Sequence, residues 1–183
     1  FGAVGDGTTD DTAALEAAIE AAYEAGGGEV VLSAKRYKIT GPVILPSDDV
    51  SRTTPVQPTI RIVGRGSGWN GVYEPRGQLT PATSVELYGS SSDGLIQSHG
   101  TGLLVLQDIH FLYKANTTDT SPIIKTTNTT LDIERCSFSG HPSITGTTTK
   151  QDAIVLGGTR RIYDDGANDA FGGYGSTIRD NFF

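Results

Sequence analysis

A polar stretch late in the chain contains five side chains that could bind or cleave a sugar: Arg160, Arg161, Tyr163, Asp164 and Asp165. Glycosidases use two carboxyl groups, which lie about 5–5.5 Å apart in retaining enzymes and about 6.5–9.5 Å apart in inverting ones. Adjacent aspartates reach either separation only through an unusual loop shape, and arginines beside them more often form solvated ion pairs. We therefore predict that these residues contact a ligand or another subunit, and we assign no catalytic residue.

A second polar stretch, residues 64–83, contains Trp69, Asn70 and Tyr73. Aromatic rings can cover the apolar face of a sugar, while amide and charged groups hydrogen-bond to its hydroxyls. The same rings could instead pin their own loop onto the rest of the protein. We predict that a glycan contacts these three residues and Tyr163 of the later stretch.

The remaining candidates for chemistry are histidines and an acidic cluster. His99 and His141 stand in Ser-His-Gly and Gly-His-Pro sequences, which are typical of surface turns. Asp6, Asp10 and Asp11 are close enough in sequence to suggest calcium, but turn and helix-capping roles explain them without a metal. We expect neither a metal nor a cofactor.

Two asparagines, Asn116 and Asn128, each begin an Asn-Thr-Thr sequence, which is the acceptor pattern for N-glycosylation. The pattern has meaning only in a host that glycosylates, and a threonine-rich chain produces it readily by chance. We retain both asparagines as possible acceptor sites.

Composition and charge exclude several classes of partner. The 183 residues carry a formal net charge of −7, whereas a nucleic-acid-binding face needs clustered positive charge. No stretch approaches the ~20 apolar residues that span a bilayer, and no signal-peptide pattern is present. The single cysteine, Cys136, cannot form an intrachain disulfide. We expect neither a nucleic-acid nor a membrane partner, and the ends at Phe1 and Phe183 suggest a piece of a longer protein.

The elements that must position the candidate residues are mostly strands. Many glycines, no methionine and few charged residues favour short strands joined by tight turns. Strand-like runs separated by Gly, Pro, Ser and Asp occupy residues 29–32, 37–39, 43–45, 59–63 and 84–88. Two long polar stretches, 64–83 and 145–176, interrupt the series, and we expect them to be surface loops that carry binding.

One segment, roughly residues 10–25, has the pattern of a helix. Its apolar residues recur at i, i+3 and i+4: Leu15, Ala18, Ile19, Ala22 and Tyr23. Side chains in Thr9–Thr12 could cap its first turn, and Gly26–Gly28 permit the left-handed conformation that ends many helices.

An eight-residue repeat occurs three times, at 104–111, 131–138 and 176–183. In each copy the first and third positions are mostly aliphatic, and the sixth and eighth are mostly apolar. Alternation sends the first and third side chains to one face, and a corner at the polar fourth and fifth positions would turn the later pair inward again. A repeat that cannot bury its own apolar face indicates a solenoid, with three unrelated strands of a β-sandwich as the alternative.

Stacking of the repeats predicts two internal columns. The eighth positions, Phe111, Phe138 and Phe183, would form one column, spaced 27 and then 45 residues apart in the chain. The third positions, Leu106, Ile133 and Ile178, would form the other.

The opening residues 1–15, FGAVGDGTTDDTAAL, resemble the N-terminal signature of pectate-lyase-superfamily β-helix proteins, a family that includes phage tail spikes and fibres. The likeness continues through the Gly26–Gly28 turn to Tyr37, and residues 60–66 are similar to the family's next rung. The family usually has Leu-Pro-x-Gly-x-Tyr before this tyrosine, whereas residues 32–37 read LSAKRY, so the chemistry of that turn differs.

The resemblance implies an all-β fold, a right-handed single-stranded parallel β-helix with an N-terminal capping α-helix. Residues 1–28 would form the N-terminal strand, turn and capping helix. Residues 29–183 would form the rungs of the coil, truncated at the C-terminal end. A cap is expected on physical grounds, because an uncovered first rung would offer its backbone groups to another chain.

Two functions are compatible with this fold. The first, favoured because no enzyme motif is visible, is a virion tail spike or fibre, or a related surface fibre. It would be extracellular or on the virion surface, self-associate as a trimer or fibre assembly, and bind a cell-surface polysaccharide. The second is a pectate-lyase-like enzyme or glycoside hydrolase acting on acidic polysaccharide, with catalytic rungs beyond Phe183. The Asn-Thr-Asp and Arg-Ile-Lys segments that polygalacturonase-type hydrolases share are missing from the sequence.

Overall fold

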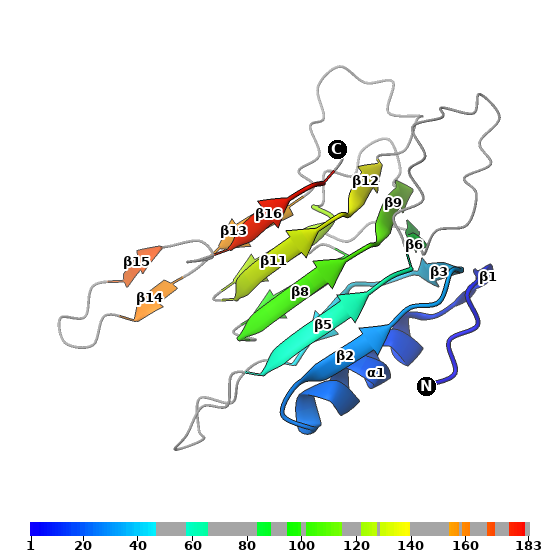
Figure 1. Cartoon of the computed structure of the whole chain (residues 1–183), viewed down its shortest axis with the longest axis horizontal. Helices are drawn as coiled ribbons and strands as arrows, with labels where there is room; N and C mark the ends of the chain where they lie inside the picture. Colours follow the sequence, from blue (N-terminus) through cyan, green and yellow to red (C-terminus); the bar gives the residue numbers. More distant parts are fainter. Residues whose placement is uncertain are drawn as a thin grey trace.

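The structure is a computed structural model that describes residues 1–46, 58–65, 84–88, 95–99, 102–114, 122–127, 129–139, 154–157, 159–161, 168–170 and 176–181. In this part of the chain one helix accompanies three parallel sheets and one antiparallel hairpin (Figure 1). None of the described helical residues forms a segment long and apolar enough to cross a membrane.

The strands form three sheets, which are named A, B and C from here on. Sheet A contains β1 (Asp6–Asp10), β3 (Arg36–Ile39), β6 (Ser84–Tyr88), β9 (His110–Lys114) and β12 (Ser137–Ser139). Sheet B contains β2 (Gly28–Val31), β5 (Thr59–Val63), β8 (Leu103–Gln107), β11 (Thr130–Glu134) and β16 (Thr177–Arg179). Sheet C contains β4 (Val43–Leu45), β7 (Ile96–His99), β10 (Ile124–Thr127) and β13 (Ile154–Gly157). The hairpin pairs β14 (Thr159–Arg161) with β15 (Asn168–Ala170).

Each rung of the coil gives one strand to each sheet, in the order B, A, C. The rungs are therefore β2-β3-β4, β5-β6-β7, β8-β9-β10 and β11-β12-β13, and β16 begins the fifth. All strand pairs within the three sheets are parallel, and the molecule is a right-handed single-stranded parallel β-helix, as predicted.

The predicted repeat stacks in the expected register. Leu131 pairs with Leu104, Phe138 pairs with Phe111, and Ile133 pairs with both Leu106 and Ile178. The rings of Phe111 and Phe138 are stacked with centroids 5.1 Å apart. Ile178 is 44% exposed because no described rung covers β16. Phe183 lies outside the described residues, so its place in the column remains a prediction.

The corner between sheets B and A depends on one backbone conformation. Asp108, Arg135 and Asp180 occupy the fifth position of the repeat, and their φ angles of 56°, 51° and 55° are left-handed. This conformation bends the chain two residues after the inward side chains of Leu106 and Ile133, so the apolar side chain that follows the bend also points inward. Arg135 donates to both carboxylate oxygens of Asp108, at 2.7 and 2.8 Å, which ties successive corners together.

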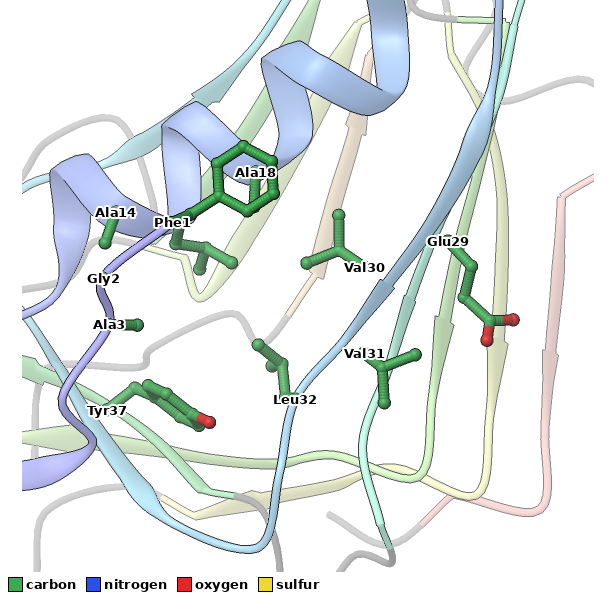
Figure 2. Close-up of a pocket in the computed structure, with 11 residues that line it drawn as sticks. Phe1, Gly2, Ala3, Ala14, Ala18, Glu29, Val30, Val31, Leu32 and Tyr37 are labelled. Atoms are coloured by element: carbon green, nitrogen blue, oxygen red, sulfur yellow. The ribbon is translucent and has the colours of Figure 1, made fainter. Parts of the chain in front are cut away.

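The helix α1 (Thr12–Glu24) covers the N-terminal end of the coil, where its buried Leu15 and Ile19 join the core and it contacts β2, β4 and β5. Figure 2 shows α1 beside Val30 and Leu32 at the mouth of the coil. The helix ends as predicted: the Gly27 amide donates to Ala22 at 3.0 Å across a left-handed Gly26.

The start of the helix differs from the prediction. Asp11 is the N-cap residue but makes no side-chain bond to the helix. Its buried carboxylate instead accepts the amides of Val4 at 2.6 Å and Gly5 at 3.1 Å. The carboxylate therefore holds the N-terminal segment against the coil.

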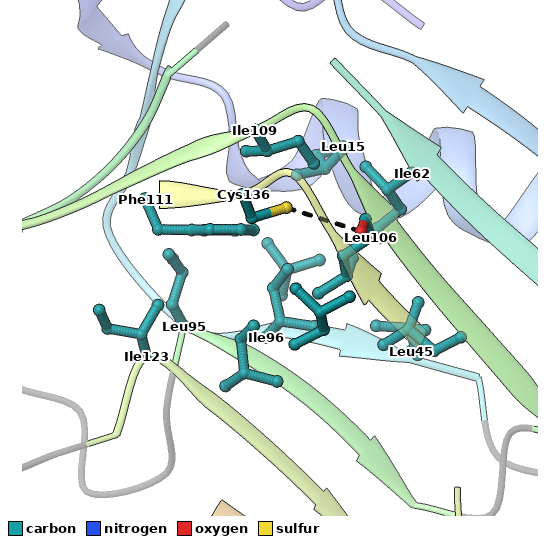
Figure 3. Packing of buried hydrophobic residues seen from close by; sticks show 14 of the residues in the cluster. Leu15, Leu45, Ile62, Leu95, Ile96, Leu106, Ile109, Phe111, Ile123 and Cys136 are labelled. Atoms are coloured by element: carbon teal, nitrogen blue, oxygen red, sulfur yellow. Dashed lines mark hydrogen bonds between the residues drawn. The ribbon is translucent and has the colours of Figure 1, made fainter. Parts of the chain in front are cut away.

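The core fills the interior of the coil and is mainly aliphatic (Figure 3). Phe111 and Ile109 are fully buried, and the Cys136 thiol points at the Leu106 carbonyl oxygen 3.6 Å away. Hydroxyl groups replace alkyl groups at the inward positions of sheet C, where Ser98 Oγ lies 2.7 Å from Thr129 Oγ1. Thr126 Oγ1 is buried without a hydrogen-bond partner.

The third strand of the later rungs was not predicted from the sequence. The strands β7 and β10 begin with the short apolar pairs Leu95-Ile96 and Ile123-Ile124 and then continue with polar residues, so alternation is weak. The prediction that residues 145–176 form one surface loop is wrong, because β13 in this stretch is a strand of sheet C and β14 and β15 form a hairpin.

Candidate functional site

Most of the predicted ligand-binding residues lie outside the described part of the chain: Trp69, Asn70, Tyr73, Tyr163, Asp164 and Asp165. The possible glycosylation sites Asn116 and Asn128 and the turn predicted at His141 also lie outside it. Their roles therefore remain predictions from the sequence.

Two of the predicted residues, Arg160 and Arg161, belong to β14. They take register positions opposite Asp169 and Asn168 in the antiparallel hairpin. Their ligand contacts also remain predictions, but the backbone that carries them is a strand rather than an irregular loop.

His99 was predicted to lie in a surface turn, and this prediction is wrong. The residue ends β7 and takes the register position beside Thr127 of β10. The strand was hidden in the sequence because only Leu95 and Ile96 mark its apolar start.

The carboxylate oxygens of the N-terminal aspartates accept hydrogen bonds from backbone amides and from threonine hydroxyls. Asp6 accepts the amides of Thr8 and Thr9, and these bonds hold the pKa of its carboxyl well below the usual range. The hydroxyls of Thr12 and Thr40 lower the pKa of Asp10 to about 2. The turn roles predicted for these residues are confirmed. Among the described residues, no three histidine, cysteine or acidic side chains are placed to hold a metal ion.

A pocket of about 370 Å³ opens beside α1 and β2 at the N-terminal end (Figure 2). Its lining is mostly alkyl and aromatic, and its polar side chains are the carboxylate of Glu29 and the hydroxyl of Tyr37. The Tyr37 hydroxyl already lies 2.9 Å from Ser33 Oγ. The pocket therefore lacks the array of hydrogen-bonding groups that a sugar requires.

The outer face of sheet B carries a chain of polar contacts, here called the sheet B ladder: Glu29, Arg61, Gln107, Glu134 and Arg179. Arg61 lies 3.2 Å from Glu29 and 3.0 Å from Gln107, and Arg179 lies 3.2 Å from Glu134. Each charge of the ladder has an opposite charge within the coil. Surface ion pairs of this kind contribute about 0–1 kcal/mol each.

The outer face of sheet A contains a buried histidine. His110 Nδ1 lies 2.6 Å from Ser137 Oγ, whereas Nε2 is buried without a hydrogen-bond partner. Burial, together with the nearby positive charge of Arg36, lowers the pKa of His110 below its ordinary value of 6.5. The imidazole is therefore neutral near pH 7, and its shielded Nε2 is not placed to meet a ligand.

The outer face of sheet C carries an amide and an ammonium group in adjacent rungs. Gln97 and Lys125 pair in register, and Ile44 takes the same position one rung earlier. Their neighbours Ile96 and Ile124 are buried in the core, so these three side chains point away from it. They form what is called the sheet C row.

The sheet C row is recessed. Gln97 is only 7% exposed although it points away from the core, and Lys125 is half-buried, whereas Ile44 is 52% exposed. Parallel strands lie about 4.8 Å apart, so the two polar groups are held at a fixed separation by the sheet. The half-buried ammonium group of Lys125 can hydrogen-bond to a carboxylate of an extended polymer, whereas the amide of Gln97 is shielded by its burial.

The single cysteine, Cys136, is buried and inert. Burial raises the pKa of its thiol to about 12, so the reactive thiolate is not populated at neutral pH.

Comparison with known proteins gives a family and several relatives. The model of the family described as rhamnogalacturonase A/epimerase, pectate lyase-like, matches residues 1–178. Mannuronan C5-epimerase AlgE2 of Azotobacter vinelandii is 50% identical over 68 residues, which are 37% of this chain and 6% of that protein. Alginate lyase 7 of the same organism is 45% identical over 69 residues, which are 37% of this chain and 8% of that protein.

A solved structure, the A-module of Azotobacter vinelandii mannuronan C-5 epimerase AlgE4, is 21% identical with a TM-score of 0.43. That match covers 76% of this chain and 40% of the solved one. The chain thus spans less than a tenth of the length of the two curated relatives described above.

Proposed function

Because this chain belongs to the rhamnogalacturonase A/epimerase, pectate lyase-like family, we propose that it is part of an extracellular enzyme that modifies an acidic polysaccharide. The single observation that carries the proposal is the sequence identity of 45–50% to proteins named as mannuronan C5-epimerases and an alginate lyase. We further propose that the polymer binds along the outer face of sheet C.

The reaction named by the term C5-epimerase indicates which groups a polymer-binding face must supply. Inverting C5 of a mannuronate requires that the C5–H bond break and form again beside a carboxylate. A cation close to that carboxylate stabilises the negative charge that develops when the proton leaves. Lys125 is a half-buried cation on the outer face of sheet C, in register with the buried Gln97 of the adjacent rung. We assign polymer binding to Lys125 and leave proton transfer unassigned.

The fibre hypothesis gains no support from the relatives described above, which are named as epimerases and a lyase. Its virion location and trimeric assembly remain predictions from the sequence. The polysaccharide partner is common to both hypotheses, and so is the glycan contact predicted for Trp69 and Tyr163.

The test is binding of oligomannuronate to the chain, measured by calorimetry for the parent, Lys125→Gln and a matched control, Arg61→Gln. Loss of one charge-assisted hydrogen bond should weaken binding by about tenfold in Lys125→Gln. Arg61→Gln removes a cation from sheet B and should bind like the parent. Equal weakening in both variants would mean that only net charge matters, and unchanged binding in Lys125→Gln would place the polymer elsewhere.

A further inference from the structure

The outward side chains of β10 include a hydroxyl as well as a cation. Ile124 and Thr126 of this strand are buried inside the coil. Lys125 and Thr127 alternate with them, are half-buried, and point away from the interior. These two residues are two positions apart on one strand, so their Cα atoms lie about 6.6 Å apart. An ammonium group and a hydroxyl therefore stand side by side on the outer face of sheet C.

The Thr127 hydroxyl has no hydrogen-bond partner in the described part of the chain. The carbonyl oxygen of Thr127 accepts a bond from Thr129 Oγ1 at 3.3 Å, but this is a backbone contact and leaves the side chain unused. The Thr129 hydroxyl, in contrast, also lies 2.7 Å from Ser98 Oγ inside the coil. A hydroxyl can both donate and accept a hydrogen bond, so Thr127 can bind a hydroxyl of a ligand in either direction.

The next rung leaves space beside Thr127. The register places His99 of β7 on one side of Thr127 and Gly157 of β13 on the other. Ile154 and Leu156 of β13 pack against the core, so alternation gives Gly157 an outward position, where it contributes no side chain. A glycine inside a strand often marks a place that a ligand approaches closely. A sugar ring can therefore reach the Thr127 hydroxyl over the bare position in β13.

We propose that Thr127 is a specificity-determining residue of the polymer site, and that it binds a ring hydroxyl of the same uronate whose carboxylate Lys125 binds. This inference rests on the proposed function. A uronate carries its carboxylate on C5 and has hydroxyls at C2 and C3 on the other side of the ring, so one ring can span the two side chains. One sugar then contacts β10 at two points.

Two contacts make the site recognise a hydroxyl as well as a charge. The Lys125 ammonium is a point charge on a flexible stem, so by itself it has little preference for the ring that carries the carboxylate. A site that hydrogen-bonds a substrate hydroxyl discriminates against an analogue in which that hydroxyl is missing or blocked. We therefore expect the chain to prefer uronates with free hydroxyls at C2 and C3 over equally charged polymers in which methyl groups block them.

Removal of the hydroxyl tests the contact. Thr127→Val keeps the β-branched shape that suits a strand, and calorimetry with oligomannuronate should show binding weakened about three- to tenfold. Thr127→Ser retains the hydroxyl and should bind within about twofold of the parent. The matched control is Thr59→Val, which removes an exposed hydroxyl from the outer face of sheet B and should bind like the parent. Gly157→Val fills the bare position in β13 and should weaken binding at least as much as Thr127→Val.

A modified ligand shows whether Thr127 meets the sugar directly. Oligomannuronate with methyl groups on its C2 and C3 hydroxyls keeps every carboxylate, and the parent should bind it about as weakly as Thr127→Val binds the unmodified oligomer. Thr127→Val should bind both oligomers alike, because the contact that methylation blocks is already absent. An equal loss on methylation in the parent and in Thr127→Val would overturn the proposal, since the hydroxyls would then be recognised elsewhere.

The same titrations separate this inference from the proposed function. Lys125→Gln that binds oligomannuronate like the parent would contradict the proposed function, and with it the pairing of Lys125 with Thr127. Weakened binding in Lys125→Gln together with parent-like binding in Thr127→Val would overturn this inference alone. Weakened binding in both variants, with Thr59→Val unchanged and methylation felt only by the parent, is the result that we expect.

Discussion

The N-terminal carboxylates and the sheet C row place polar side chains under opposite conditions. Asp11 is buried, and both of its oxygens accept backbone amides within one local turn. Gln97 and Lys125 stand on a regular sheet and come from rungs 28 residues apart in the chain. The Asp11 carboxylate is fixed by neighbours in sequence, whereas the sheet C row is assembled only when the coil stacks.

This difference separates residues that maintain the fold from residues that can meet a partner. A carboxylate whose acceptors are filled by amides has little capacity left for a ligand, and its removal leaves donors unpaired. A side chain that points outward from a sheet can change without disturbing the ladder of backbone bonds behind it. Substitutions in the two regions should therefore affect different measurements.

The largest effect is expected from Asp11→Ala. The variant leaves the amides of Val4 and Gly5 without their acceptor, and hydrogen bonds to a charged group contribute about 1.5–3 kcal/mol each. We expect a loss of about 2–4 kcal/mol in the free energy of unfolding, measured by urea denaturation. Glu20→Ala on the exposed side of α1 should change it by less than about 0.5 kcal/mol. Similar free energies of unfolding for the two variants would contradict the structural role of Asp11.

The next largest effect is a dependence of the free energy of unfolding on pH, which is caused by His110. Burial lowers the folded-state pKa of this residue, so below about pH 6.5 the unfolded chain binds a proton that the folded chain does not. Stability should therefore fall as the pH decreases from about 7 to 5, by at most about 1.4 kcal/mol per pH unit. The carboxylates Asp6 and Asp10, whose pKa values are lowered, act in a separate window below their ordinary value of 3.8.

Urea denaturation across this range assigns the effect to one histidine. His110→Asn can keep the bond to Ser137 but cannot titrate, so the dependence should disappear. The variant with both His99→Gln and His141→Gln retains only His110 and should behave like the parent. A flat profile for that double variant would contradict the assignment to His110.

A smaller effect is expected inside the coil. Thr126→Val replaces a buried hydroxyl that has no partner with a methyl group of similar size, and should stabilise the protein by about 1 kcal/mol. Ser98→Ala removes a hydroxyl that bonds to Thr129, and should destabilise by a similar amount. Thermal unfolding of both variants measures the contrast. Equal signs would mean that the interior hydroxyls do not differ in hydrogen bonding.

The sequence predicts the rungs better than it predicts the site. The repeat could be aligned because Leu106, Ile133 and Phe138 alternate with polar residues around a polar corner. The later strands of sheet C, β7 and β10, could not be found, because their inward positions include Ser98 and Thr126, which break the apolar alternation. Without those strands, the register that pairs Gln97 with Lys125 cannot be inferred from the sequence.

Two further features depend on the folded environment. The burial of His110 follows from its surroundings in the coil, since its outward position in β9 alone predicts exposure. The Asp11 carboxylate has the position of a helix cap, but it accepts hydrogen bonds from the amides of Val4 and Gly5 instead of from the helix. Sequence patterns give the position of such residues in an element. Their hydrogen-bond partners and burial depend on which groups the folded chain brings close to them.

The most direct test of the account is to locate the polymer on the coil. Backbone amide chemical shifts of the chain, recorded with and without oligomannuronate, report which strands contact it. We expect the perturbed amides to concentrate in β7 and β10, around Gln97 and Lys125, and those of the sheet B ladder and of residues 4–11 to stay unchanged. Perturbation centred on sheet B or on the N-terminal turn, with β7 and β10 unaffected, would contradict it.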